Sequence, residues 1–441
     1  MSADQDVDIL INAKWIIPVI PEDQVFSDCS IVIAANKIVG IYPQSEALKR
    51  FNATEIIDLN EHALIPGLIN AHGHLAMSLM RGYADDLPLY TWLEQHIWPA
   101  EGRWVSPEFV KDGAQLAMAE MIRGGTTCFS DMYFFPDQVA EAAQQANMRA
   151  QITAPVLDFP TAWADNADEY ISKAIEVHDQ FRTSSLITVG FGPHAPYTVS
   201  DAPFQKVATY AEELQAPIQV HLHETAQEVS DALSNTGKRP VERLNDLGFF
   251  SPAVQCVHMT TLTDEDIEII QRCGAHVIHC PESNLKLASG MAPVAKLLKA
   301  GVNVALGTDG CASNNDLDLL GEMRTAALLA KAVSGDAAVV NAHQALRMAT
   351  INGARAMGKE REIGSLEVGK FADIAAIKLD QIENLPMFNP VSQLVYSHVS
   401  HQVSDVWVNG QPVMRQRELL TLNQRDITNR IQQWQQKMSA K

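Results

Sequence analysis

The chain has 441 residues, of which 46% are hydrophobic and 20% are charged, as in an ordinary globular protein. This length suits one large domain with a smaller one beside it. The net charge of −20 disfavours nucleic acids and anionic membranes as partners. No apolar run reaches the roughly 20 residues of a membrane span, and the first residues lack a secretory signal pattern, so we expect a cytoplasmic protein.

The first part of the chain, residues 7–60, reads as short strands and turns. From residue 63 to residue 367, short apolar segments alternate with helical patterns, two of which begin with clear caps at Ser106-Pro107 and Thr263-Asp264. Eight such strands predict a closed parallel (β/α)8 barrel, a TIM-like α/β fold, over residues 63–367. The strands are expected near 64–72, 126–132, 149–157, 186–193, 218–223, 254–259, 276–280 and 303–308.

Residues 371–415 again read as short strands, with a hairpin turn signal at Asn409-Gly410. Neither end of the chain has enough apolar strands for a core of its own. We therefore predict that residues 1–62 and 368–441 combine into one small β-sandwich domain with a C-terminal helix. The apolar face of that helix would consist of Ile427, Ile431, Trp434 and Met438.

The six cysteines are scattered, and no two of them form a Cys-x-x-Cys pair. This spacing argues against a disulfide framework. We therefore expect reduced, buried thiols at Cys29, Cys128, Cys256, Cys273, Cys280 and Cys311.

Polar side chains stand where several of the barrel strands end. In such a barrel the functional groups gather at the carboxyl ends of the strands. His72 and His74 follow the first strand and, being two residues apart, share one face of an extended segment. The others are His194 after the fourth strand, His221, His223 and Glu224 at the fifth, His258 at the sixth and Asp309 at the eighth.

Each of these residues, taken singly, has an ordinary structural explanation. A lone histidine is more often hydrogen-bonded than metal-bound, Asp309 could cap a helix, and Glu224 could be a solvated carboxylate at a helix start. Their gathering at one mouth of one barrel favours a metal site instead. Three nitrogens and one oxygen suit Zn²⁺ or Fe²⁺, and the predicted ligands are His72, His74, His221 and Asp309.

A metal in that position can activate water by lowering its pKa to about 7. Glu224 lies three residues beyond His221, where it could act as a proton shuttle, and His258 could orient or deprotonate the water. No bridging lysine follows the fourth strand, where His194 stands instead. We therefore predict one metal ion rather than two.

These motifs resemble the metal-dependent amidohydrolase superfamily, and in particular its 5′-methylthioadenosine/S-adenosylhomocysteine deaminase branch. The resemblance runs through nearly the whole chain. The motifs that carry it are Pro66-Gly67-Leu68-Ile69-Asn70-Ala71-His72-Gly73-His74, Arg81-Gly82, Gly192-Pro193-His194-Ala195-Pro196-Tyr197, His221-Leu222-His223-Glu224-Thr225, Ser283-Asn284-Leu285-Lys286-Leu287 and Gly307-Thr308-Asp309-Gly310-Cys311-Ala312-Ser313-Asn314-Asn315.

The resemblance implies that the four predicted ligands hold zinc. Glu224 would deliver a proton to the purine N1 while Asp309 and His258 draw a proton from the attacking water, so that ammonia leaves and a 6-oxo purine remains. His194 would contact the purine ring, and Glu101 would accept the two ribose hydroxyls of a small-molecule nucleoside.

The long segment 75–104 after the first strand holds more apolar bulk than a connector needs, which predicts a lid or a rim cover. Its large side chains include Met77, Met80, Trp92, Trp98 and Trp104, and we expect Trp92 to contact the substrate.

One departure from the family bears on the substrate. Some relatives that accept S-adenosylhomocysteine carry an arginine near the end of the third strand, suited to the substrate's carboxylate, and here Ala154 occupies its approximate place. The loop that follows, Asp158-Phe159-Pro160-Thr161-Ala162-Trp163, is apolar and acidic. A carboxylate left unpaired on binding is costly, so we predict a preference for 5′-methylthioadenosine, with S-adenosylhomocysteine or adenosine as weaker substrates.

Two alternatives stay open. The chain could be another amidohydrolase, such as a guanine or cytosine deaminase or a triazine chlorohydrolase, although Glu101 and His194 together favour a nucleoside. It could also be a catalytically silent barrel that acts as a binding protein, which the complete metal set and Glu224 disfavour. The zinc-dependent cytidine deaminase fold is excluded because its Pro-Cys-x-x-Cys signature is missing. We expect a homo-oligomer.

Overall fold

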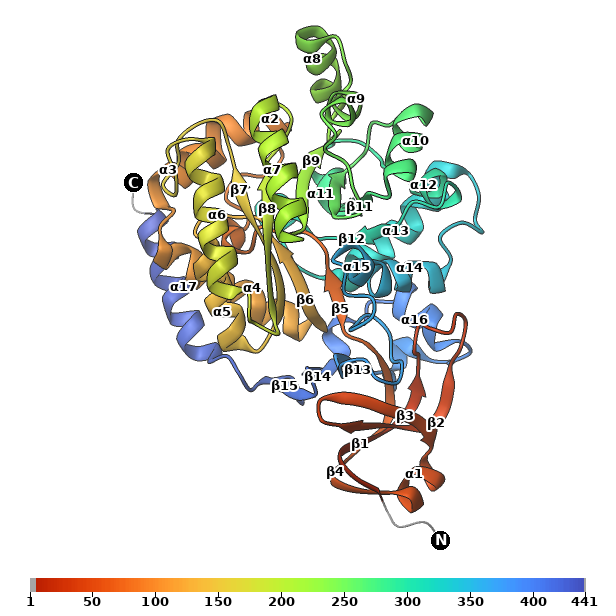
Figure 1. Ribbon diagram of the computed structural model, residues 1–441. Helices are drawn as coiled ribbons and strands as arrows, with labels where there is room; N and C mark the ends of the chain where they lie inside the picture. The colour runs from red at the N-terminus through yellow and green to blue at the C-terminus, as the bar shows by residue number, and fades with distance from the viewer. Residues whose placement is uncertain (1–4, 440–441) are drawn as a thin grey trace.

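A computed structural model describes residues 5–439 of the chain, and two eight-stranded sheets organise them (Figure 1). One sheet is parallel throughout and curves into a barrel in the order β5 to β12, which confirms the predicted (β/α)8 architecture. The barrel closes between its first and last strands, where Ala71 N donates to Leu306 O at 2.8 Å and Gly73 pairs with Asp309. The strands are β5 (Leu68–Asn70), β6 (Thr126–Asp131), β7 (Arg149–Val156), β8 (Ile187–Pro193), β9 (Ile218–Leu222), β10 (Val254–His258), β11 (His276–His279) and β12 (Val304–Leu306).

The second sheet combines strands from both ends of the chain, as predicted. Its order is β16-β15-β14-β13-β4-β1-β2-β3, and the central pair joins the two ends through antiparallel pairing of Pro66 with Ile374. The strands are β1 (Gln5–Ile16), β2 (Phe26–Ala34), β3 (Lys37–Pro43), β4 (Phe51–Pro66), β13 (Ile374–Lys378), β14 (Val403–Val408), β15 (Gln411–Arg415) and β16 (Glu418–Leu419). The exact limits of the two predicted domains stay a prediction.

The segment expected as one strand at 64–72 is divided between the two sheets. β4 ends at Pro66 in the terminal sheet and β5 begins at Leu68 in the barrel. Gly67 lies at the crossing, where a Cβ would come within 2.1 Å of Thr127 Oγ1. Only a glycine fits this close approach, so the chain passes from one sheet to the other within a single residue.

Helices cover the outside of the barrel, and α8 and α9 project from its carboxyl end (Figure 1). The two predicted caps are present: Ser106 Oγ accepts from Phe109 N, and Thr263 forms a capping box with Asp266. The helices are α1 (Gln44–Arg50), η1 (Leu75–Met80), α2 (Leu89–Trp92), η2 (Leu93–Ile97), α3 (Trp98–Trp104), α4 (Pro107–Arg123), α5 (Pro136–Ala146), α6 (Ala167–Phe181), α7 (Asp201–Leu214), α8 (Ala226–Thr236), α9 (Pro240–Asp246), α10 (Asp264–Cys273), α11 (Pro281–Lys286), α12 (Val294–Lys299), α13 (Leu319–Ser334), α14 (Ala342–Met348), α15 (Ile351–Ala356), η3 (Ile382–Asn384), α16 (Pro390–Tyr396), η4 (Ser400–Gln402) and α17 (Gln424–Ser439).

The C-terminal helix α17 packs against α4 of the barrel, although the sequence analysis grouped it with the terminal β-domain. Trp434 Nε1 donates to Asp112 Oδ2 at 2.9 Å, and the Trp434 and Phe109 rings meet edge to face at 5.3 Å. The helix therefore braces the barrel wall next to the segment that follows His74.

The six cysteines form no disulfide in the structure, and five of them are buried. Cys273 is partly exposed. Among the helices of residues 5–439, none has the length and apolarity that a membrane crossing requires.

Candidate active site

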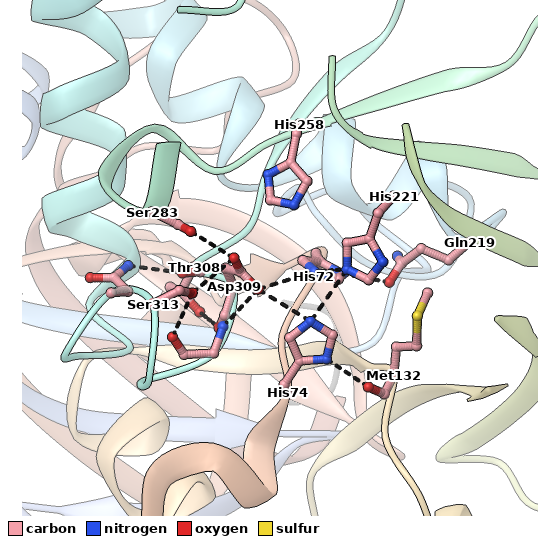
Figure 2. A network of polar contacts seen from close by, with 12 residues as sticks. His72, His74, Met132, Gln219, His221, His258, Ser283, Thr308, Asp309 and Ser313 are labelled. Atoms are coloured by element: carbon pink, nitrogen blue, oxygen red, sulfur yellow. Dashed lines mark hydrogen bonds and ion pairs between the residues drawn. The ribbon is translucent and has the colours of Figure 1, made fainter. Parts of the chain in front are cut away.

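The predicted metal ligands meet at the carboxyl end of the barrel, where β5, β9 and β12 come together (Figure 2). Asp309 Oδ1 lies 3.4 Å from His72 Nε2 and 3.2 Å from His74 Nε2. His221 Nε2 lies 3.3 Å from the Nε2 atoms of both His72 and His74. Four donor atoms from three strands thus point at one centre.

These separations fit donor atoms that share one divalent metal ion. Neighbouring donor atoms with bonds of about 2.0 Å to zinc lie roughly 3.3 Å apart, which matches the four separations just given. A set of three imidazoles and one carboxylate also has the softness that Zn²⁺ and Fe²⁺ accept. The side chains therefore fit the metal in both spacing and chemistry.

Each histidine of the set has its other ring nitrogen held by an oxygen acceptor. An acceptor at Nδ1 places the proton there and leaves the Nε2 lone pair free toward the centre. The acceptors are Gln219 Oε1 for His72 at 2.7 Å, the Met132 carbonyl for His74 at 2.6 Å and the His194 carbonyl for His221 at 2.8 Å.

Asp309 stands in a left-handed backbone conformation, with φ of 62°, in the loop that follows β12. Its Oδ2 accepts hydrogen bonds from Ser283 Oγ at 2.6 Å and Ser313 Oγ at 2.9 Å. Burial alone would raise the pKa of Asp309, but its contacts with His72 and His74 hold the pKa well below the usual range. The carboxylate is therefore ionised and oriented with one oxygen toward the metal centre.

Glu224 lies beside this centre and is placed to act as a proton donor. Its Oε1 accepts from Ser289 Oγ at 3.1 Å, and its Oε2 lies 3.8 Å from His258 Nε2. Burial, followed by the negative charge of Asp309, raises the pKa of Glu224 to about 8. Glu224 therefore carries a proton at neutral pH, as a general acid requires.

His258 presents a free ring nitrogen to the same space. Asn284 Oδ1 holds its Nδ1 at 2.8 Å, so the Nε2 lone pair faces the site. Burial lowers the pKa of His258, so the ring is neutral and can accept a proton. Its backbone is also left-handed, with φ of 74°, a conformation of the kind that clusters at functional sites.

His223 does not belong to the site, although the sequence placed three candidates at the end of β9. Its Nδ1 lies 2.9 Å from the Thr261 carbonyl, and its Nε2 accepts from Val241 N at 3.2 Å. The ring is fully buried and ties the turn after β9 to α9, which is the ordinary structural role.

A cavity of about 270 Å³ opens beside the metal centre and contains the remaining predicted residues. His194 and Trp92 line it, the latter from the predicted lid, and Trp92 is buried. Glu101 lines the lid side and accepts a hydrogen bond from Tyr133 Oη at 2.6 Å. Burial raises the pKa of Glu101 to about 7, against the opposing effect of the Tyr133 hydroxyl.

The part of the lining that comes from the loop after β7 is largely apolar. Ala154 is fully buried in β7, and the loop that follows contributes Leu157, Phe159 and Pro160 to the lining. No lysine or arginine of the described residues lines this cavity. It therefore offers no cationic partner to a substrate carboxylate.

Sequence reasoning missed the side chains that orient the predicted ones. Gln219 stands two residues before His221 on β9, so its strand face could have been read from the sequence. Tyr133 and Ser289 come from loops whose paths no local pattern fixes. Ser283, Asn284 and Ser313 lie in motifs named above, although their roles could not be read from the motifs alone.

Comparison with known proteins places the chain in a family. The model of the amidohydrolase family matches residues 63–413, and the chain belongs to this family. It is 52% identical to a 5-methylthioadenosine/S-adenosylhomocysteine deaminase of Teredinibacter turnerae, over 99% of this chain and 98% of the relative. It is 54% identical to a protein of the same name from Saccharophagus degradans, over 98% of this chain and 97% of the relative.

Solved structures agree with this placement. A zinc-bound adenosine deaminase from Xanthomonas campestris superposes with a TM-score of 0.97 at 48% identity, covering 99% of each chain. An atrazine chlorohydrolase from Arthrobacter aurescens shares the fold, with a TM-score of 0.89 at 24% identity over 97% of this chain and 99% of the other.

Proposed function

We propose that this protein deaminates adenine nucleosides hydrolytically, with 5′-methylthioadenosine as its preferred substrate and ammonia and the 6-oxo nucleoside as products. The observation that carries the proposal is the convergence of His72, His74, His221 and Asp309, with the buried Glu224 carboxyl beside them and within 3.8 Å of His258. The deaminase relatives at 52% and 54% identity support the reaction class.

The metal is proposed to be a single zinc ion held by His72, His74, His221 and Asp309. When bound, it would supply Lewis acidity that activates a water molecule for attack on the purine C6. The spacing of the donor atoms and the zinc-bound neighbour support this assignment.

Proton transfer is proposed to fall to three side chains. Glu224 hydrogen-bonds the purine N1 and delivers its proton there, which makes C6 more electrophilic. His258, neutral and with its Nε2 free, takes a proton from the attacking water together with the ionised Asp309. The proton taken from the water then passes to the amino group, which leaves as ammonia, and the new C6 hydroxyl returns a proton to Glu224 as the 6-oxo group forms.

Recognition of the ribose is proposed to rest on Glu101. Its carboxylate lines the cavity on the lid side, and Tyr133 fixes one of its oxygens. A carboxylate accepts from two neighbouring hydroxyls, which a free base lacks. His194 lines the cavity next to His221 and would contact the purine ring, and Trp92 would close the cavity from the lid.

The preference for a methylthio group follows from the largely apolar lining that the loop after β7 contributes to the cavity. A zwitterionic homocysteine tail would lose its hydration there without gaining a cationic partner. The oligomeric state and the cellular location stay predictions.

The test is a substrate panel of 5′-methylthioadenosine, S-adenosylhomocysteine, adenosine, adenine, guanine and cytosine, with ammonia release measured alongside metal content. We expect the highest kcat/KM for 5′-methylthioadenosine. Glu101→Ala should reduce kcat/KM for the nucleosides far more than for any free base, and Glu224→Gln should lower kcat by about 10²- to 10⁴-fold because it cannot supply the proton. Reaction of free bases alone would refute the nucleoside assignment, and a clear advantage for S-adenosylhomocysteine would refute the preference.

A further inference from the structure

A second, more open cavity of about 900 Å³ adjoins the substrate cavity on the outside of the barrel mouth. The two cavities share two lining residues, Phe159 and Tyr197. We propose that these two aromatic rings form a wall that limits the length of the 5′ substituent of the substrate. This inference rests on the proposed function, because it assigns the 5′ end of a nucleoside to that wall.

The backbone beneath the two rings is fixed. Asp158 N donates to Thr198 O at 3.1 Å, and Ser200 N donates to Asp158 Oδ2 at 2.9 Å. These hydrogen bonds tie the loop after β7 to the loop after β8, so Phe159 and Tyr197 face the cavities from neighbouring loops. The position of the wall therefore depends on the size of the Phe159 and Tyr197 side chains.

The two rings themselves are partly exposed, at 39% for Phe159 and 38% for Tyr197. Tyr197 packs edge to face against His194 at 6.0 Å, and Phe159 lies 6.2 Å from Trp98. Each ring thus contacts the substrate cavity on one side and the outer cavity on the other. Removal of one ring would join the two spaces without emptying the protein core.

The orientation of the nucleoside follows from the groups already assigned. The purine lies against Glu224 and His258, and the ribose hydroxyls lie at Glu101. We assign the 5′ substituent to the apolar loop 157–162, which also lines this cavity. Phe159 belongs to that loop. A methylthio group ends before the wall, whereas a longer chain meets it.

The outer cavity offers space and, among the described residues, no free cation to a longer substituent. Arg243 is held by Asp201 at 2.7 Å through its Nε, and Lys238 is paired with Asp246. A neutral chain is therefore the cleaner probe of the wall, because it needs no ionic partner in the outer cavity.

The experiment compares 5′-butylthio-5′-deoxyadenosine with 5′-methylthioadenosine, each measured as kcat/KM and as Kd by calorimetry. In Phe159→Ala we expect the butylthio-to-methylthio ratio of kcat/KM to rise by about 10-fold or more, since pocket discrimination reaches that size for a single methylene. Phe159→Trp, which enlarges the wall, should lower the same ratio. Leu247→Ala is the matched control, because Leu247 lines only the outer cavity and should leave the ratio at the parent value.

An unchanged ratio in both Phe159 variants would overturn the proposed wall, and a parallel change in Leu247→Ala would do the same. Deamination of 5′-methylthioadenosine by the parent protein would still uphold the proposed function in either case. If the parent deaminated no nucleoside, the proposed function would fail. The proposed wall would then be tested by binding alone, as the ratio of the two thioethers' Kd values in Phe159→Ala compared with the parent.

Discussion

Gln219 sets the orientation of a metal ligand from inside the barrel. Its amide oxygen holds His72 Nδ1 at 2.7 Å, while its amide nitrogen donates to the Ala71 carbonyl at 3.0 Å and to Gln255 Oε1 at 2.8 Å (Figure 2 shows the contact with His72). Both ends of the amide are engaged, so it cannot rotate without losing hydrogen bonds. The proton of His72 therefore stays on Nδ1 and its Nε2 stays available to the metal.

We predict that Gln219→Leu weakens zinc binding by about 10- to 100-fold, the usual cost of losing the partner of a ligating histidine. Competition with a chromophoric chelator measures this. Gln219→Glu keeps an acceptor for His72 and should recover most of the affinity. Gln151→Leu is the matched control, because Gln151 bonds Gln255 in the same buried cluster and does not touch His72. Equal zinc affinity in the parent and Gln219→Leu would contradict the role.

The convergence of His72, His74, His221 and Asp309 could be predicted from the sequence, because a barrel brings the ends of its strands to one mouth; their role as metal ligands stays a prediction. His223 shows the limit of that reasoning. It shares a face with His221 by spacing, yet a left-handed backbone at φ of 52° turns it away toward Val241 and Thr261. Strand periodicity ends where the strand ends, so a residue one step beyond it cannot be assigned to a face.

At the scale of elements, the close approach of α4 to η1 supports the segment that follows His74. Gly113 of α4 faces Ala76 of η1, and a Cβ there would lie 2.5 Å from the Ala76 carbonyl oxygen and 2.8 Å from its Cα. Helix packing this tight against backbone requires glycine.

We predict that Gly113→Ala destabilises the protein by about 1 to 3 kcal/mol through overpacking, despite the higher helix propensity of alanine. Denaturant unfolding of the metal-free protein measures this change. Gly102→Ala in α3 is the matched control, because a Cβ there meets nothing within 4 Å and only the propensity gain applies. A Gly113→Ala variant as stable as the parent would show that η1 can shift away from α4 without loss of stability.

The strands of the barrel were predicted within a few residues, since buried parallel strands read as short apolar runs. The division of the 64–72 run between two sheets was not predictable from that signal. Apolar content is the same on both sides of Gly67, and the switch depends on Thr127, which is distant in sequence. A local sequence pattern predicts that a segment forms a strand, but it does not predict which sheet the strand joins.

At the scale of the whole molecule, the composite terminal sheet followed from the shortage of apolar strands in each end alone. The contacts that join this sheet to the barrel could not be predicted from the sequence. Arg149 at the start of β7 pairs with Asp373, just before β13, with Nε–Oδ2 at 3.0 Å and Nη2–Oδ1 at 3.3 Å. Their side chains are 4% and 2% exposed, and the two residues are 224 apart in sequence.

This buried pair predicts strong, non-additive effects on stability. Arg149→Met would leave the Asp373 carboxylate buried, with Asn409 N as its remaining donor at 2.7 Å, and should lower the free energy of unfolding by about 3 to 5 kcal/mol. Arg149→Met combined with Asp373→Asn removes both charges and should recover a large part of that loss, which a double-mutant cycle in urea measures. The exposed pair Lys206–Asp168 is the matched control, and Lys206→Met should leave stability near the parent value because solvent screens it. Additive losses from the two buried positions would mean that Arg149 and Asp373 are not energetically coupled across the two sheets.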